Sequence, residues 1–570
     1  MRPNSLFLIA IIMAFCSIIY ELAIAKTVSL LTGNVVLWES LTISVYIAGL
    51  GIGAYIYAKS ENSQKEQYLL KAEIILAITA SFSIVGIFVL HVLYRVYFYG
   101  FDFGVSRSFS IFNSTLIFGF LAQIMTLLVA VPSGIELPAL LDMVNRSTKK
   151  DSSNRLLAFF YFGTLVGTFW FAWAWLPYVD IPYAVVFTVS LNVCLCLWLM
   201  KEFQQFKPIS IAVMMSVIVF CFVVTPVIYQ IQLKNFYSGR LQKITQTNDG
   251  LILFNTPTLL QRIEMLRQQP TVERIKTHAQ MIDVVTKQSS KKSEKVVSIK
   301  QPYRVHMNGH FQFSSLNEAD YHEHMVHVPL ALHETLPCHV LVLGAGDGLL
   351  IRELLKHDEI CDITLVEYDQ GILDFAINDK RLSELNKNSL QSSKVKIVVN
   401  DAFMYLRQTK SMYDAIYIDF PYPFSYDLAR LYSIEFSYLV KRRLNKAGFI
   451  VVDVPFKLQE SNEANMIVFN TLYYAGFRQI TAFQSSGESF ISAELTPIKR
   501  QFIPQEDKFR SGRRATQFSF NQKVLDIPLR YLRPDYFSSP WIQKLNYQPN
   551  RLLVNSILQP RILHLTDPLF

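Results

Sequence analysis

The stretch Val340-Leu341-Val342-Leu343-Gly344-Ala345-Gly346-Asp347-Gly348 decides the fold of the C-terminal half of this 570-residue chain. Four apolar residues suited to a buried strand run directly into a glycine-rich turn, and a helical pattern follows. Glycines at such a turn let the backbone bend sharply and approach a ligand closely. The stretch therefore predicts the first strand of a parallel sheet and a ligand-binding turn at its carboxyl end.

Further apolar, β-prone runs follow along the chain and alternate with helical patterns. Together with Val340–Leu343 they are Ile363–Val366, Val395–Val399, Ala415–Ile418 and Phe449–Val452. Strands that alternate with helices are typical of parallel sheets covered by helices. We therefore expect a Rossmann-like α/β domain of the S-adenosylmethionine methyltransferase type.

Acidic residues stand in the turns where four of these strands end: Asp347, Glu367, Asp401 and Asp419. The carboxyl ends of parallel strands meet at one edge of the sheet, where such folds bind ligands. Glu367, about 20 residues after the glycine-rich turn, is placed to accept both hydroxyls of a ribose. Asp401 is suited to contact an adenine amino group. Any one of these acids alone reads better as a helix cap, but four together indicate a nucleoside site.

The turn also restricts the class of nucleotide. The chain lacks the G-x-x-x-x-G-K-[ST] pattern of phosphate-cradling loops. An acid within the glycine-rich turn, Asp347, would repel a pyrophosphate but would suit a cationic sulfonium. We therefore expect a cofactor of the S-adenosylmethionine type rather than NAD.

The N-terminal part of the chain has a different composition. Hydrophobic residues make up 51% and charged residues 17% of the chain, and the first 230 residues hold only 11 of its 45 acidic residues. A membrane span needs about 20 apolar residues. Seven runs qualify, the first of them read as a retained helix rather than a cleaved signal: Ser5–Ala25, Val35–Ala58, Lys71–Tyr94, Ile111–Val131, Leu156–Pro177, Ile181–Met200 and Ile209–Ile231. Glycines at 49, 51, 53, 163 and 167 recur at spacings that let such helices approach closely.

These observations predict three regions: a membrane domain of about seven helices over 1–232, a small β-rich part over 233–320, and the Rossmann-like domain over 321–570. The segment 287–295 reads as a solvated hairpin tip, with contact to anionic lipid as the alternative. The net charge of +9 collects beside the predicted spans, as it does in membrane proteins. We therefore expect a lipid bilayer, and no nucleic acid, as a partner.

Several motifs resemble the polyamine aminopropyltransferase (spermidine synthase) family, and the N-terminal half resembles its membrane-bound branch. The segments of the soluble part are Met307–Phe313, Asp320-Tyr321-His322-Glu323, His327–Leu330, Gly344–Gly348, Glu367-Tyr368-Asp369, Asp401, Asp419 and Leu431–Phe436. The segments of the membrane part are Tyr20–Leu22, Leu31–Gly33, Ser40–Ile43, Leu50–Ala54 and Gly134–Pro138. The Tyr-His-Glu segment followed by G-x-G-D-G is the most specific of them.

The resemblance implies transfer of an aminopropyl group from decarboxylated S-adenosylmethionine to a small amine, without a metal. It also implies that Tyr321 and Asp419 orient and deprotonate the amine, since an alkylammonium must lose a proton before it can attack. The residues expected to bind the nucleoside are Gln312, His322, Gly344, Gly346, Asp347, Glu367 and Asp401.

The acceptor side departs from the family pattern. The family reads D-S-x-D-P at the catalytic strand end, and Tyr422 stands here in place of the second acid. Gln484 falls where the family has a later Tyr. Both positions are expected to line the acceptor site, and they put putrescine as the acceptor in doubt. Two alternatives stay open: a methyltransferase, or a non-catalytic sensor or transporter, for which the membrane acids Glu21 and Glu136 are candidate residues.

Orientation and assembly are less constrained by the sequence. With seven spans, the basic residues after spans two, four and six place the soluble half outside the cytoplasm, whereas the expected cofactor is cytosolic. We follow the cofactor and expect a multi-pass protein of the cell membrane with a cytoplasmic catalytic domain; a homodimer stays open. Cys338 and Cys361, each two residues before a strand, should then be neighbouring free thiols.

Overall fold

A computed structural model describes most of the chain. The described residues are 3–32, 35–60, 65–97, 107–147, 152–205, 208–237, 243–246, 252–255, 271–277, 279–286, 302–333, 335–423, 425–454, 463–496, 521–533, 536, 542–544, 549–559 and 561–564. The chain divides into two compact units, Met1–Glu273 with Val285–Gln301, and Arg274–Val284 with Pro302–Pro568. The predicted hairpin tip at 287–295 lies outside the described residues.

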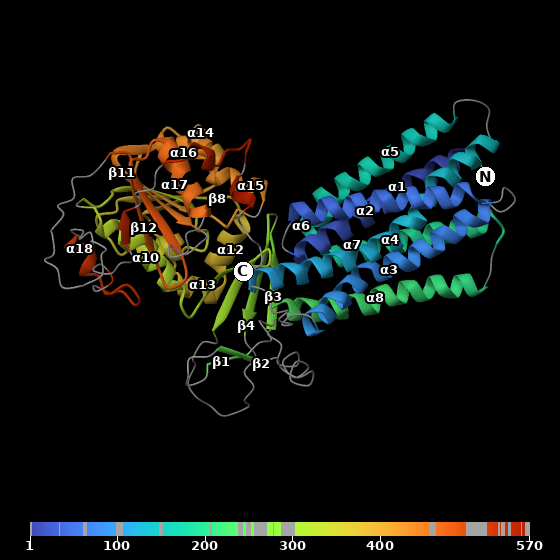
Figure 1. Ribbon diagram of the computed structural model, residues 1–570, viewed down its shortest axis with the longest axis horizontal. Helices are drawn as coiled ribbons and strands as arrows, with labels where there is room; N and C mark the ends of the chain where they lie inside the picture. Colours follow the sequence, from blue (N-terminus) through green and yellow to red (C-terminus); the bar gives the residue numbers. More distant parts are fainter. Residues whose placement is uncertain are drawn as a thin grey trace. The chain divides into compact units, whose positions relative to one another are not determined.

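The first unit is a bundle of long apolar helices (Figure 1). Its helices are α1 (Pro3–Thr32), α2 (Val35–Ala58), α3 (Lys65–Tyr97), α4 (Arg107–Ser147), α5 (Ser152–Trp170), α7 (Ile181–Glu202) and α8 (Pro208–Tyr237). Helix α5 continues through a π-helical turn, η2 (Phe171–Trp175), into the short α6 (Leu176–Tyr178). Among the described residues, seven helices are long and apolar enough to cross a membrane, as the sequence predicts.

Glycines set the closest helix contacts of this bundle. A side chain at Gly53 of α2 would collide with the carbonyl oxygen of Val131 in α4, and one at Gly163 of α5 would collide with that of Ile11 in α1. The backbones of these helix pairs therefore touch, which is the role that small residues play in membrane bundles. A side chain at Gly51 would meet nothing within 4 Å, so this glycine takes no part in the contacts.

The predicted β-rich region contains short antiparallel elements. Strands β1 (Lys243–Gln246) and β2 (Ile252–Asn255) pair with each other. A second sheet has the order β3-β4-β5-β6, with strands β3 (Thr271–Lys276), β4 (Met281–Thr286), β5 (Tyr303–Met307) and β6 (His310–Ser314).

The second unit is built on an eight-stranded sheet of order β14-β12-β13-β11-β10-β7-β8-β9 (Figure 1). The five parallel strands are β7 (His339–Gly344), β8 (Asp362–Glu367), β9 (Val395–Val399), β10 (Tyr413–Asp419) and β11 (Leu444–Val454). The antiparallel strands are β12 (Gln479–Gln484), β13 (Ser489–Glu494) and β14 (Ile542–Lys544). All five predicted strands are confirmed, and with them the Rossmann-like fold.

Helices cover both faces of this sheet, and the period of two along each strand separates the two cores. Tyr417 and Val451 pack with the first group of helices, whereas Ile416 and Ile450 pack with the second. The first group is α10 (Glu318–Ala331), α11 (Leu349–Leu354), α12 (Gln370–Asn378) and α13 (Lys380–Leu385). The second group is α14 (Ala402–Gln408), α16 (Ile434–Lys441) and α17 (Glu463–Ala475), together with the short α15 (Tyr426–Ala429). The short α18 (Gln522–Leu525) packs against α10.

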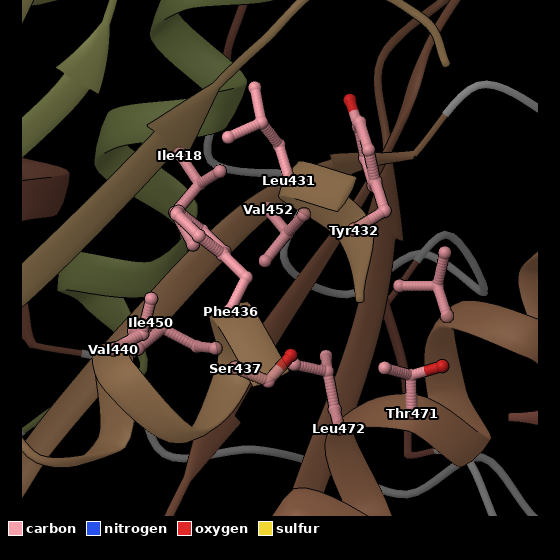
Figure 2. A pocket seen from close by; sticks show the side chains of 11 residues that line it. Ile418, Leu431, Tyr432, Phe436, Ser437, Val440, Ile450, Val452, Thr471 and Leu472 are labelled. Atoms are coloured by element: carbon pink, nitrogen blue, oxygen red, sulfur yellow. The ribbon is translucent and has the colours of Figure 1, made fainter. Parts of the chain in front are cut away.

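Figure 2 shows a small cavity in the second of these cores, between β10, β11, α16 and α17. Its lining is almost entirely apolar and includes Ile418, Phe436, Val452 and Leu472. A ligand site needs a few convergent polar groups, so this cavity is part of the core rather than a candidate site.

Cys338 and Cys361 are joined by a disulfide at the amino ends of β7 and β8. The Cys361 backbone N–H also donates to the Cys338 carbonyl oxygen at 2.8 Å, and the two Cα atoms are 4.7 Å apart. The sequence correctly predicts that these residues are neighbours. The expectation of two free thiols is wrong, because adjacent parallel strands bring the sulfur atoms within bonding distance.

Candidate active site

Alternation along the strands points several acids toward the same side of the sheet. Asp419 and Asp453 follow Tyr417 and Val451 by two residues, so they face the α10 side. Gly344, which pairs with Asp419 in the neighbouring strand, has a φ of +84°. A side chain at Gly344 would run into the Asp419 carbonyl oxygen, so glycine is required where these two strand ends meet.

Tyr321 of α10 meets Asp419 directly. Its hydroxyl donates to Asp419 Oδ1 at 2.7 Å, and its ring packs edge-on against Phe490 with centroids 5.0 Å apart. Burial, followed by the charge of Asp347, raises the pKa of Asp419 to about 6. Burial and the Asp419 carboxylate raise the pKa of Tyr321 well above its usual value. The structure thus pairs the two residues expected to deprotonate the amine.

The neighbours of Tyr321 in its motif hold α10 in place. Asp320 accepts hydrogen bonds from the backbone N–H of Ser486 (3.2 Å) and from the Ser486 hydroxyl. The buried Glu323 accepts from three consecutive backbone N–H groups, those of residues 530, 531 and 532, at 2.7 to 3.0 Å. These bonds fix the Tyr321 side chain relative to the loop after β12.

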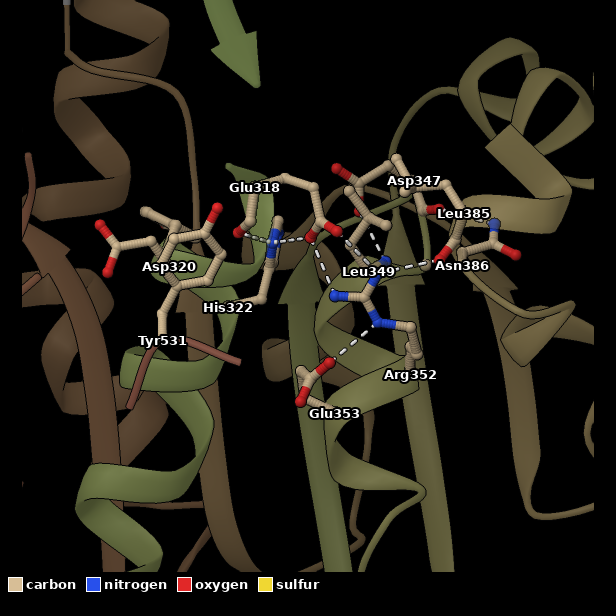
Figure 3. Close-up of polar contacts among 12 residues, drawn as sticks. Glu318, Asp320, His322, Asp347, Leu349, Arg352, Glu353, Leu385, Asn386 and Tyr531 are labelled. Atoms are coloured by element: carbon tan, nitrogen blue, oxygen red, sulfur yellow. Dashed lines mark hydrogen bonds and ion pairs between the residues drawn. The ribbon is translucent and has the colours of Figure 1, made fainter. Parts of the chain in front are cut away.

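Buried ion pairs orient His322, as Figure 3 shows. His322 Nδ1 lies 2.7 Å from the Glu318 carbonyl oxygen and 3.0 Å from Glu318 Oε2. Arg352 donates to both carboxylate oxygens of Glu318 at 2.9 Å and to Glu353 at 2.8 Å. Burial opposes the charge on His322, but Glu318, assisted by Asp347, raises its pKa. The imidazole is thereby held with its Nδ1 against Glu318.

Asp347 and Glu367, both expected to bind the nucleoside, lie at the carboxyl ends of the neighbouring strands β7 and β8. Asp347 Oδ1 accepts from the Leu349 backbone N–H at 2.9 Å, and burial raises its pKa although His322 opposes the shift. Burial likewise raises the pKa of Glu367 to about 7. A side chain at Gly346 would lie 2.8 Å from Glu367 Oε2. A larger residue there would therefore displace the Glu367 side chain or Ile372.

Two residues expected to bind the nucleoside, Asp401 and Gln312, make their hydrogen bonds outside this cluster. Asp401 caps α14 through the Met404 N–H (2.9 Å) and pairs with Arg430 at 2.7 Å, so both of its oxygens already have partners. Gln312 lies on β6, where its amide donates to the His310 carbonyl oxygen at 3.4 Å. No contact among the described residues joins Gln312 to Tyr321, His322 or Asp419.

Around Tyr422, which is expected on the acceptor side, lie two carboxylates that the sequence analysis does not single out, Glu488 and Asp453. The Tyr422 hydroxyl donates to Glu488 Oε2 at 2.5 Å. Asp453 is 6% exposed, and its Oδ1 has no hydrogen-bond partner among the described residues. Burial, then Glu488 and Asp419, raises its pKa well above the usual range. Gln484 also has an amide oxygen without a partner in the described part, while its backbone binds Tyr536.

Both missed acids leave a signal in the sequence. Asp453 follows directly after the predicted strand Phe449–Val452, at the same edge as the four acids singled out. Glu488 follows Gly487 in the loop that only loosely matches the family. Among the described residues, no group of three or more His, Cys, Asp or Glu is placed to hold a metal ion. The arrangement suits acid–base and electrostatic chemistry on a cationic substrate.

Comparison with known proteins identifies relatives of the chain. Residues 318–470 match the family model of the spermine/spermidine synthase domain. A polyamine aminopropyltransferase of Leptospira interrogans is 28% identical over 553 residues, which cover 94% of this chain and 99% of that protein. Polyamine aminopropyltransferase 1 of Streptomyces coelicolor is 29% identical over 78% of this chain and 75% of that protein. The similarity therefore extends well beyond residues 318–470.

Among solved structures, the spermidine synthase of Thermotoga maritima is 20% identical, with a TM-score of 0.36 over 48% of this chain and 86% of that one. A spermidine synthase in complex with the transition state analogue AdoDATO is 21% identical, with a TM-score of 0.37 over 48% and 84% of the two chains.

Proposed function

Since this chain is a spermidine synthase-like protein related to polyamine aminopropyltransferases, we propose that it transfers an aminopropyl group from decarboxylated S-adenosylmethionine to an amine. The observation that carries the proposal is the bond between Tyr321 and Asp419, with the buried Asp453 beside it. A carboxylate and a phenol at the edge of a nucleoside-binding sheet suit the deprotonation of an ammonium.

The donor set fits a sulfonium nucleoside. Glu367 would accept the ribose hydroxyls, because a carboxylate offers several lone pairs, and Asp401 would contact the base with the lone pairs that its cap and Arg430 leave over. Asp347 would face the cationic end of decarboxylated S-adenosylmethionine. The methionine tail of S-adenosylmethionine carries a carboxylate, which would instead need a hydrogen-bond donor or a cation at this position. This difference favours the decarboxylated donor over S-adenosylmethionine itself, and so favours aminopropyl over methyl transfer.

Proton transfer is the step that the residues of this chain perform. The acceptor ammonium gives a proton to Asp419, whose raised pKa of about 6 makes it a competent base near neutral pH. Tyr321 holds that carboxylate in position through its hydroxyl. The bound donor supplies a methylene carbon attached to a sulfonium sulfur. The amine nitrogen bonds to this carbon while the C–S bond breaks, and the sulfur leaves as a neutral thioether. Positioning of the amine can then supply much of the rate.

We propose that the acceptor is held by carboxylates which replace the missing family acid. Tyr422, which stands in place of that acid, donates to Glu488, so a carboxylate is present after all, but it comes from another loop. With Asp453 and Asp419 it gives three acids whose negative charges repel one another, since Glu488 and Asp419 both raise the pKa of Asp453. Such a pocket suits an acceptor that carries at least two ammonium groups.

We further propose a location for the soluble unit. Seven apolar helices support insertion in the cell membrane. The Cys338–Cys361 disulfide is stable in oxidising compartments and not in a reducing cytosol. It supports the orientation that the basic residues predict, with the catalytic unit outside the cytoplasm, over the cytoplasmic orientation that a cytosolic donor favours. A C-terminal reporter fusion that is active only in the cytoplasm should stay silent, and an active fusion would contradict this orientation.

The transfer itself is tested by mass spectrometry of the products. Purified full-length protein is incubated with decarboxylated S-adenosylmethionine and a panel of mono-, di- and triamines. We expect di- or triamines to gain one aminopropyl group, with release of methylthioadenosine. Products that gain only a methyl group from S-adenosylmethionine would support the methyltransferase reading, and no product with either donor would refute the proposal.

A further inference from the structure

Two carboxylates lie in the interior of the helical bundle. Glu73 of α3 is 0% exposed and Glu136 of α4 is 1% exposed. Asn192 of α7 donates to Glu73 Oε2 at 2.6 Å, and Ser133 donates to Glu136 Oε1 at 3.1 Å. The charges of the two carboxylates act on each other, so they belong to one cluster.

Several oxygen atoms of this cluster have no hydrogen-bond partner among the described residues. The Ser133 hydroxyl can donate its one hydrogen to Glu136 while it accepts from the Ser17 hydroxyl (2.7 Å), so only one oxygen of Glu136 is bonded. Glu73 Oε1 and Glu136 Oε2 have no partner among the described residues. The hydroxyl of the fully buried Tyr20 of α1 also lacks a described partner, and it lies within electrostatic reach of both carboxylates.

The bundle also provides no cationic side chain for these acids. Among the ion pairs of the described residues, none includes Glu73 or Glu136. Glu39, in the same bundle, shows the contrast, because Lys26 lies 3.1 Å from its carboxylate. Burial of an unpaired carboxylate is costly, and acids inside membrane helices usually mark a cation or proton pathway.

We propose that Glu73, Glu136 and Tyr20 form a cation-binding site within the helical bundle, open to an alkali-metal ion or to the ammonium group of an amine. Both ligands take oxygen donors and need no thiolate or imidazole. The unpartnered oxygens of the two acids would coordinate the cation or accept its N–H groups. The Tyr20 hydroxyl would complete the set. The site is separate from the transfer chemistry and does not rest on it.

The test measures cation binding by the full-length protein in lipid nanodiscs, without a nucleoside donor. Sodium, potassium and 1,4-diaminobutane are titrated at constant ionic strength with choline, and the apparent Tm is recorded. A ligand that binds only the folded state raises the Tm with its concentration. The diamine series compares all bundle variants on the Asp453→Asn background, so that the weakened soluble pocket contributes equally to each of them.

We expect a Tm increase with at least one cation, and a loss of roughly tenfold or more in affinity in Glu73→Gln, Glu136→Gln and their combination. Tyr20→Phe should weaken binding severalfold without loss of folding. Glu39→Gln removes a membrane acid that already has a partner and should bind as the wild type does. A Tm increase with the diamine alone identifies an organic ammonium as the ligand. A Tm increase with sodium or potassium identifies an inorganic cation as the ligand. No response, or the same response in the Glu73/Glu136 double variant as in Glu39→Gln, would overturn the proposal.

Discussion

Asp419→Asn should lower turnover strongly and stabilise the protein at the same time. The pKa of Asp419 is about 6 in the folded chain, against about 3.9 for an unperturbed Asp. The folded state therefore favours the protonated acid, and ionisation costs stability. This cost is absent below pH ~4, grows as the pH rises to about 6, and stays constant above it. Asparagine keeps an oxygen that accepts the Tyr321 hydroxyl but cannot ionise.

The size of the effect follows from the pKa difference. About two pKa units correspond to about 3 kcal/mol, and the Asp419 side chain keeps some exposure, so we expect about 1–2 kcal/mol of stabilisation at pH 8. Turnover should fall by a factor of about 10²–10⁴, the usual cost of a lost general base. Wild-type turnover should itself rise with pH through about 6.

Scanning calorimetry of both proteins from pH 4 to pH 8 measures the first effect, and methylthioadenosine release measures the second. The two Tm values should coincide near pH 4 and separate as the pH rises, with the variant higher. A variant that is less stable at pH 8 would show that the carboxylate is structural. Turnover near the wild-type level would remove Asp419 from the role of base.

Three further changes test the remaining parts of the site. Glu367→Gln should weaken nucleoside binding by about 1.5–3 kcal/mol, the scale of hydrogen bonds to a charged group; unchanged calorimetric affinity would move the ribose site elsewhere. Glu488→Gln should raise the KM for the amine and leave donor affinity unchanged, and an effect on the donor alone would contradict the acceptor pocket. Replacing Cys338 and Cys361 by serine should lower the free energy of unfolding by about 3 kcal/mol, as expected for a closed loop of 23 residues; two free thiols in wild-type protein alkylated at cell lysis would refute the disulfide.

The sequence predicts the sheet well because its strands are buried on both faces. Runs such as Val340–Leu343 and Phe449–Val452 are continuous in apolar residues and end in turn residues, which is a strong local signal. The antiparallel strands β12 and β13 escape the prediction. Their outer residues, such as Thr481 and Ser492, are buried by the rest of the fold, and a local pattern does not report this burial.

The site is only partly visible in the sequence. Asp419 and Tyr321 are 98 residues apart, and their pairing follows from motifs rather than from spacing. Glu488 and Tyr422 come from different loops, so their contact depends on how Asp320 anchors the loop after β12. Such long-range contacts have no periodicity that a sequence pattern can show. The same holds for the pairing of Glu73 with Asn192, which are 119 residues apart.

The central claim is that the acid-rich strand edge serves an aminopropyl donor. Isothermal titration of the full-length protein with decarboxylated S-adenosylmethionine and with S-adenosylmethionine tests it most directly. We predict tighter binding of the decarboxylated donor, and a smaller preference in Asp347→Asn, because the charge that disfavours the carboxylate-bearing tail is then gone. Equal or tighter binding of S-adenosylmethionine by the wild-type protein would contradict the account.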